Sequence, residues 1–140
     1  MALNTELIGK EYGRVEFAVE RDRVVQFADA IGDDEPRYRE GEAPIAPPTF
    51  PTVMQIQTGG QVVLDQELGL DYTRVVHGEQ EYVMERPLRA GDRLVARPRI
   101  ADIYARGPNE FLVVETTITD ERGDLVCTGR STLISRGTAA

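Results

Sequence analysis

The feature that most constrains the fold is one apolar helical segment, followed by a half-chain made almost entirely of strand-like runs. Residues 52–69 read TVMQIQTGGQVVLDQELG, and their apolar positions surround most of the axis of the helix that they predict. A helix that is apolar on all sides is typical of a buried position. We therefore expect this helix to lie at the centre of the molecule, with Thr52 as its N-cap.

The second half of the chain predicts four antiparallel strands joined by short glycine-bearing turns. The runs rich in β-branched residues span residues 77–88, 93–105, 110–119 and 124–135. A fifth strand is predicted upstream, where Val15, Phe17 and Val19 alternate with charged or small residues. One face of such a sheet needs an apolar cover, which the helix supplies. The sequence thus predicts a single α+β domain over residues 1–140, with an antiparallel sheet of about five strands wrapped around a central helix.

The segment upstream of the central helix predicts a short helix and a stiff connector. Apolar residues within 24–31 recur at helical spacing, and Gly32 ends the pattern. Residues 41–51 read GEAPIAPPTFP, and their prolines favour an extended chain. Within the central helix, Gly59 and Gly60 each cost up to about 1 kcal/mol relative to alanine. Either the helix breaks there or something packs against its bare backbone.

Charge and composition exclude several functions. The net charge of −8 argues against a nucleic-acid partner, because phosphate backbones attract clustered cations. One cysteine and one histidine exclude an internal disulfide and a zinc site. No signal peptide is visible, and no run approaches the roughly 20 apolar residues of a membrane helix. We expect a cytoplasmic protein that binds no metal and does not enter a membrane.

Residues 27–40, FADAIGDDEPRYRE, place three consecutive acids directly after a helix. They resemble the hydratase motif of the MaoC-like hotdog hydratases and dehydratases, which runs aromatic, small residues, Gly-Asp, any residue, Asn-Pro, aliphatic, His. The Gly-Asp pair and the Pro match. Glu35, Arg37 and Tyr38 stand where the family has Asn, an aliphatic residue and the catalytic His.

The resemblance implies a hotdog fold and a chemistry in which Asp and His activate one water for syn addition across an enoyl thioester. In the family, backbone donors at the start of the central helix polarise the thioester carbonyl. Asp33 and Tyr38 are then the candidate catalytic residues. A phenol with an ordinary pKa of about 10 is a poor base near neutral pH, so half of the acid/base pair is absent. The alternative is that Asp33 satisfies backbone donors of a turn and that Tyr38 packs.

A narrower resemblance rests on APPTF (46–50), HGEQEYVMERPLRAGD (77–92) and the spacing of Asp33, Asp34 and Tyr38. These segments resemble the N-terminal dehydratase-type subfamily, which includes accessory subunits of mycobacterial-type (3R)-hydroxyacyl-ACP dehydratases. The resemblance implies the acyl-binding half of an (R)-specific enoyl-thioester hydratase or 3-hydroxyacyl-thioester dehydratase. Its partner would be a second hotdog subunit, in a homodimer or heterodimer. Its substrate would be an acyl-CoA or acyl-ACP, with no cofactor.

Six further residues are candidates for substrate binding. Phe50, Met54 and Ile56 are placed to line an acyl pocket, although such residues are more often plain core. The sole histidine, His77, lies outside the catalytic position of the family motif and has a structural or interface role as its alternative.

Arg86 and Arg89 are the other two candidates for substrate binding. They are suited to the phosphates of coenzyme A or to an acidic carrier protein. The alternative is that both arginines lie on a solvent-exposed strand face and pair with nearby acidic residues.

Two other functions remain open from the sequence. One is a self-sufficient homodimeric hydratase that uses Asp33 with Tyr38 or His77. The other is a non-catalytic acyl-CoA binding module.

Overall fold

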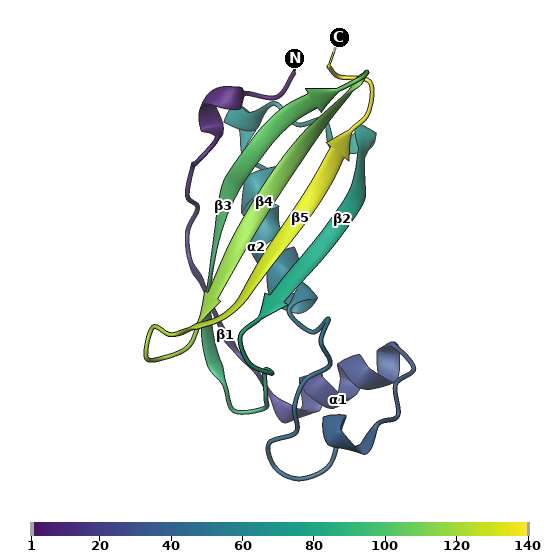
Figure 1. Ribbon diagram of the computed structural model, residues 1–140, viewed down its shortest axis with the longest axis vertical. Coiled ribbons are helices and arrows are strands. Elements are labelled where there is room, and N and C mark those ends of the chain that lie inside the picture. The colour runs from purple at the N-terminus through teal and green to yellow at the C-terminus, as the bar shows by residue number, and fades with distance from the viewer. Residues whose placement is uncertain (1, 140) are drawn as a thin grey trace.

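The computed structural model describes residues 2–139, which form one antiparallel five-stranded sheet with a helix lying along it. The helices are α1 (Arg21–Ala30) and α2 (Thr52–Val63), and the strands are β1 (Val15–Ala18), β2 (Val75–Met84), β3 (Arg93–Arg106), β4 (Asn109–Thr119) and β5 (Leu125–Ser135). The strand order is β1-β3-β4-β5-β2. Figure 1 shows α2 running behind the long strands, with α1 and its loops at the end opposite both termini. The predicted α+β sheet around a central helix is confirmed.

The core consists of two apolar clusters on the side of the sheet that faces α2. Around the start of α2, Phe50 and Met54 are fully buried, and the Phe50 ring meets those of Phe17 and Phe27 edge-on at 6.3 and 5.4 Å. Around its end, a second cluster includes Val62, Leu68, Ile100, Leu112 and Val114. Because burying a large apolar side chain contributes roughly 1.5–3 kcal/mol, these contacts fix the position of the helix against the sheet.

The central helix is shorter than the sequence predicts. It ends at Val63, and the Asp65 carboxylate accepts the amide of Glu67 to start a separate 3₁₀ turn over Gln66–Leu68. The predicted N-cap was also wrong. Pro51 precedes the first helical residue, and the Thr52 hydroxyl is hydrogen-bonded to the Tyr82 hydroxyl at 2.5 Å. The Thr52 hydroxyl therefore bonds to a residue of β2 instead of capping the helix as its sequence position predicts.

The expectation that α2 is buried on all sides was wrong. Ile56 and Leu64 are 73% and 80% exposed. Gly59 and Gly60 do not break the helix, and a Cβ added to either would meet nothing within 4 Å. Residues 2–139 contain no helix that is long and apolar enough to cross a membrane.

The N-terminal segment is fastened to the end of α2 by a charged cluster. Lys10 Nζ and Tyr12 Oη both donate to Asp65 Oδ2, at 2.6 and 2.7 Å. The hydrogen bond from Lys10, followed by that from Tyr12, lowers the pKa of Asp65. Burial, with the same carboxylate, raises the pKa of Tyr12. The ionised form of Asp65 is thus the one that the fold stabilises.

Replacing Asp65 tests this cluster. A carboxyl whose pKa is depressed in the folded state contributes stability that is complete above its ordinary pKa of about 3.9 and is lost as the pH falls towards the folded value. Asp65→Asn should lower the urea midpoint of unfolding at pH 7, and its difference from the wild type should shrink below about pH 4. The exposed Asp34→Asn is the control and should leave the midpoint unchanged at both pH values. A difference for Asp65→Asn that is constant with pH would contradict the assignment.

Candidate functional site

The uncovered side of α2 forms one wall of a groove of about 650 Å³. The other walls come from β2, β4, β5 and the segment before β2. Most of the lining is apolar or glycine, and it comprises Ile56, Gly59, Gly60, Val63, Leu64, Tyr72, Val75, Val114 and Leu133, with Thr52, Gln55, His77, Gln80 and Ser131 as the polar members. The two glycines leave the helix backbone bare towards this side. An elongated apolar ligand fits this composition.

Strand β2 lies at the edge of the sheet beside the groove (Figure 1). Within residues 2–139 it pairs only with β5, so the backbone groups of its outer edge have no strand partner. Val76 and Val83 on this strand are 41% and 50% exposed. A long unpaired edge with exposed apolar side chains is a template for pairing with another chain.

A chain of polar side chains crosses the apolar groove. Gln55 Nε2 donates to Ser131 Oγ at 2.6 Å, and Gln80 Nε2 donates to Gln55 Oε1 at 2.7 Å. Gln80 Oε1 accepts from Ser131 Oγ at 2.6 Å and lies 3.1 Å from His77 Nε2. Gly129 leaves room for this arrangement, because a Cβ there would lie 2.9 Å from Gln55 Oε1. The network joins α2, β2 and β5.

The acidic loop after α1 is held by its own hydrogen bonds. Asp33 Oδ1 accepts the amide of Glu35 at 3.0 Å, which closes a turn. Arg39 donates to the Asp33 carbonyl and pairs with Asp29 at 2.6 Å. At least one oxygen of the candidate catalytic carboxylate is therefore engaged in shaping the loop.

Tyr38 is 4% exposed and lies apart from the groove. It borders a second cleft of about 400 Å³, between residues 37–48 and the end of β2. The Arg37 guanidinium stands 5.1 Å from the centroid of its ring. His77 lines the groove and not this cleft, so the structure does not bring the two candidate partners of Asp33 together.

The first amides of α2 are occupied by the turn that precedes it. The N–H groups of residues 52–55 donate to carbonyls of residues 49–51 at 3.0–3.1 Å. Pro47, Pro48 and Pro51 carry no N–H. The first four amides of α2 are therefore not free for the thioester polarisation that the family resemblance assigns to the start of this helix.

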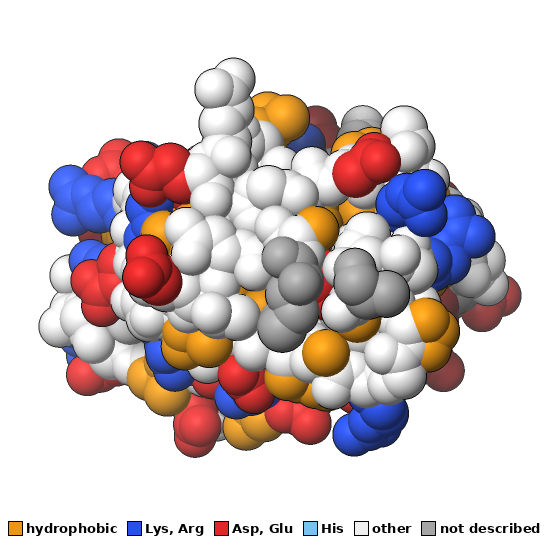
Figure 2. Space-filling model, turned by 90° about the horizontal axis from the view of Figure 1, so that it is seen from above, with side chains coloured by type: hydrophobic (Ala, Val, Ile, Leu, Met, Phe, Trp, Pro, Cys, Tyr) orange, Lys and Arg blue, Asp and Glu red, His pale blue; other side chains and the backbone are white. Residues whose placement is uncertain are grey.

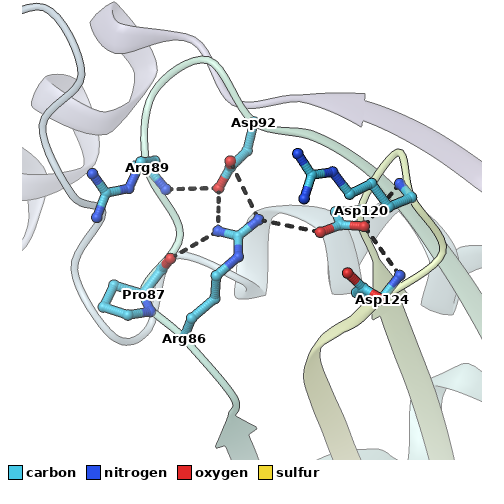
Figure 3. A network of polar contacts seen from close by, with 7 residues as sticks. Arg86, Pro87, Arg89, Asp92, Asp120 and Asp124 are labelled. Atoms are coloured by element: carbon cyan, nitrogen blue, oxygen red, sulfur yellow. Dashed lines mark hydrogen bonds and ion pairs between the residues drawn. The ribbon is translucent and has the colours of Figure 1, made fainter.

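Arg86 is engaged by acidic neighbours (Figure 3). Its guanidinium lies between Asp92 and Asp120, with N···O distances of 2.8 and 3.9 Å. The hydrogen bond to Asp92 raises the pKa of Arg86. The Arg89 amide donates to Asp92 at 2.9 Å, while the Arg89 guanidinium points away from this network. Of the two predicted phosphate ligands, Arg89 therefore has the freer side chain.

The other predicted substrate-binding residues divide between core and groove. Phe50 and Met54 are fully buried and do not line the groove, whereas Ile56 does.

At the end of the molecule that carries the termini, Figure 2 shows acidic and basic side chains interleaved around the rim, with hydrophobic side chains in small groups. Within the described part of the chain, no three His, Cys, Asp or Glu side chains gather in a way that could hold a metal ion.

Sequence reasoning did not identify Gln55, Gln80 or Ser131. The only local signal is that Gln55 lies among apolar residues of a helix predicted to be buried. Its partners are 25 and 76 residues away in the chain and become neighbours only through the pairing of β2 with β5.

The glycines of α2 can be tested separately from any ligand. Gly60→Ala should raise the free energy of unfolding by about 0.5–1 kcal/mol, because the added methyl meets nothing and alanine favours a helix. Gly107 is the matched control. A Cβ there also meets nothing, but its φ is +58°, so Gly107→Ala should lower stability by about 1–2 kcal/mol. Urea unfolding measures both, and a loss of stability in Gly60→Ala would mean that the helix needs this glycine for packing.

Comparisons with known proteins agree with this architecture. A family model described as "FAS1-like, dehydratase domain region" matches residues 6–129. The "UPF0336 protein" of Saccharopolyspora erythraea is 44% identical over 148 residues, covering 99% of this chain and 95% of the relative. That of Thermobifida fusca is 41% identical over 148 residues, covering 99% and 97%.

Solved structures of other proteins share the fold of this chain. The C-terminally truncated HadBC (3R-hydroxyacyl-ACP dehydratase) complex of Mycobacterium tuberculosis matches with a TM-score of 0.83 and 26% identity, over 94% of this chain and 99% of that one. The R-hydratase PhaJ1 of Pseudomonas aeruginosa shares the fold, with a TM-score of 0.68 and 14% identity over 92% and 81%. The chain therefore belongs to the FAS1-like dehydratase family and has the hotdog fold of the MaoC-like hydratases and dehydratases.

Proposed function

We propose that this chain is the acyl-binding subunit of an (R)-specific enoyl-thioester hydratase or 3-hydroxyacyl-thioester dehydratase. The observation that carries the proposal is the groove along α2, which is apolar, elongated and open beside the free edge of β2. An acyl chain laid against Ile56, the bare backbone at Gly59 and Gly60, and Val63 would bury apolar surface of both molecules.

Residues of a partner subunit would supply the chemistry. In this chain Asp33 already accepts a hydrogen bond from its own loop, and Tyr38 is buried away from the groove. A hydration step needs a group that takes and returns a proton near neutral pH, and imidazole is suited to this. We therefore assign the Asp/His pair to the partner.

The partner is a second hotdog subunit that pairs with the outer edge of β2. This pairing would satisfy the free backbone groups of the strand and cover Val76, Val83 and the open side of the groove. The similarity to a chain of the HadBC complex supports this arrangement. The acyl carrier is coenzyme A or a carrier protein, and Arg89 is the cation with the freer side chain to contact it.

Hydration of crotonyl-CoA and trans-2-decenoyl-CoA, followed by loss of enoyl absorbance, tests the assignment. The purified chain alone should give no turnover. A complex with a second hotdog chain that carries an intact Gly-Asp-x-Asn-Pro-x-His motif should be active. Removing the histidine of that motif should lower its kcat by about 10²- to 10⁴-fold, whereas Asp33→Asn in this chain should leave kcat unchanged.

Two results would replace the proposal. Turnover by the chain alone that disappears in Asp33→Asn would identify a self-sufficient hydratase. Stabilisation by acyl-CoA without turnover in any complex would identify a binding module.

A substitution in the groove tests acyl binding within the active complex. Ile56→Arg should raise the KM for decenoyl-CoA at least about tenfold, because a charge replaces apolar contact along the chain. The KM for crotonyl-CoA should rise less, since its short chain contacts a smaller part of the groove. Gln57→Arg is the matched control, because Gln57 is an exposed α2 residue that does not line the groove. Equal effects of the two variants on decenoyl-CoA would argue against an acyl groove.

A further inference from the structure

The polar network in the groove does not use all of its hydrogen-bond donors. Each glutamine carboxamide carries two N–H groups. Gln55 donates one of them to Ser131 Oγ, and Gln80 donates one to Gln55 Oε1. The second N–H of each side chain has no partner among residues 2–139. Two amide donors on neighbouring elements are therefore available at the wall of the groove.

The orientation of Gln80 is set by its neighbours. Its Oε1 accepts from the Ser131 hydroxyl at 2.6 Å and lies 3.1 Å from His77 Nε2. With its oxygen accepting from Ser131 and lying beside His77, the amide nitrogen of Gln80 faces Gln55. Ser131 and His77 are thus positioning residues for this carboxamide. The Gln55 side chain packs beside Gly129, where a Cβ would lie 2.9 Å from its Oε1, and the residue is only 7% exposed.

These donors lie in a groove that is otherwise mainly apolar. Once a ligand or partner excludes water, an N–H group in such a place that has no acceptor destabilises the complex with that ligand or partner. An alkyl chain alone gives these groups nothing to bind. A ligand with an oxygen acceptor at this point pairs with them, and a site built to form a hydrogen bond discriminates against an analogue that lacks the acceptor.

We propose that the carboxamides of Gln55 and Gln80 hold the carbonyl oxygen of the bound acyl thioester. The proposal rests on the acyl-binding function argued above. The amides at the start of α2 are already bonded to residues 49–51, so these side chains take over the role of carbonyl donors in this chain. The acyl tail then runs from Gln55 towards Val63, about 12 Å along α2, past the bare backbone of the two glycines.

Nuclear magnetic resonance of the ¹⁵N-labelled chain tests the proposal, since the side-chain amide signals report the two donors directly. The probes are octanoyl-CoA and its thioether analogue, S-octyl-CoA, which differs by the missing carbonyl oxygen. We expect the side-chain signals of Gln55 and Gln80 to move downfield with the thioester and not with the thioether. The thioester should bind about five- to a hundredfold more tightly, the range expected for two hydrogen bonds.

Variants assign the signals and provide the control. Gln80→Met removes the exposed donor with little change in size and should reduce the preference for the thioester to about two- to tenfold, the range expected for the one remaining hydrogen bond from Gln55. Gln57→Met, on the helix that carries Gln55 but outside the groove lining, should keep the full preference. Equal binding of the two probes by the wild type, or a preference that is unchanged in Gln80→Met, would overturn the carbonyl site while leaving the acyl groove in place. Failure of both probes to bind would overturn the proposed acyl-binding function itself.

Discussion

The central helix α2 packs one of its sides into the sheet and leaves the opposite side uncovered. Met54, Thr58 and Val62 are fully buried, whereas Ile56 on the same twelve-residue helix and Leu64 directly after it are largely exposed. Burial of the inner side fixes the helix across β3, β4 and β5, and the uncovered side becomes the wall of the groove. The same apolar character therefore stabilises the fold on one side and is available for binding on the other.

The acidic loop after α1 keeps its shape through hydrogen bonds to its own backbone. Arg39 bonds to the Asp33 carbonyl and pairs with Asp29, and Arg21 Nε donates to the Gly41 carbonyl at 2.8 Å. Two arginines thus tie the loop to its own backbone and to α1, while Asp34 and Glu35 are exposed. Among the three acids after the helix, Asp33 closes a turn by accepting the Glu35 amide, which agrees with the structural interpretation of that residue.

Polar groups within the groove are arranged differently from those on the loop. Gln55, Gln80 and Ser131 form a closed set of hydrogen bonds and still leave two N–H groups unused. Their position between α2 and the edge strand β2 places these donors where a partner subunit would close the groove. Binding of an acyl group, its orientation and assembly would then depend on the same few side chains.

The sequence by itself determined the kinds of element and their order. Alternation around Phe17, helical spacing up to Gly32, the apolar helix and the four strand runs all reflect which residues must be buried, and that requirement is local. It did not determine which side of α2 stays open, because Ile56 and Met54 are equally apolar and only the sheet selects between them. It also did not show that Thr52 bonds to Tyr82, or that Gln55 meets Gln80 and Ser131. Those contacts depend on the register of β2 against β5, which joins residues far apart in the chain.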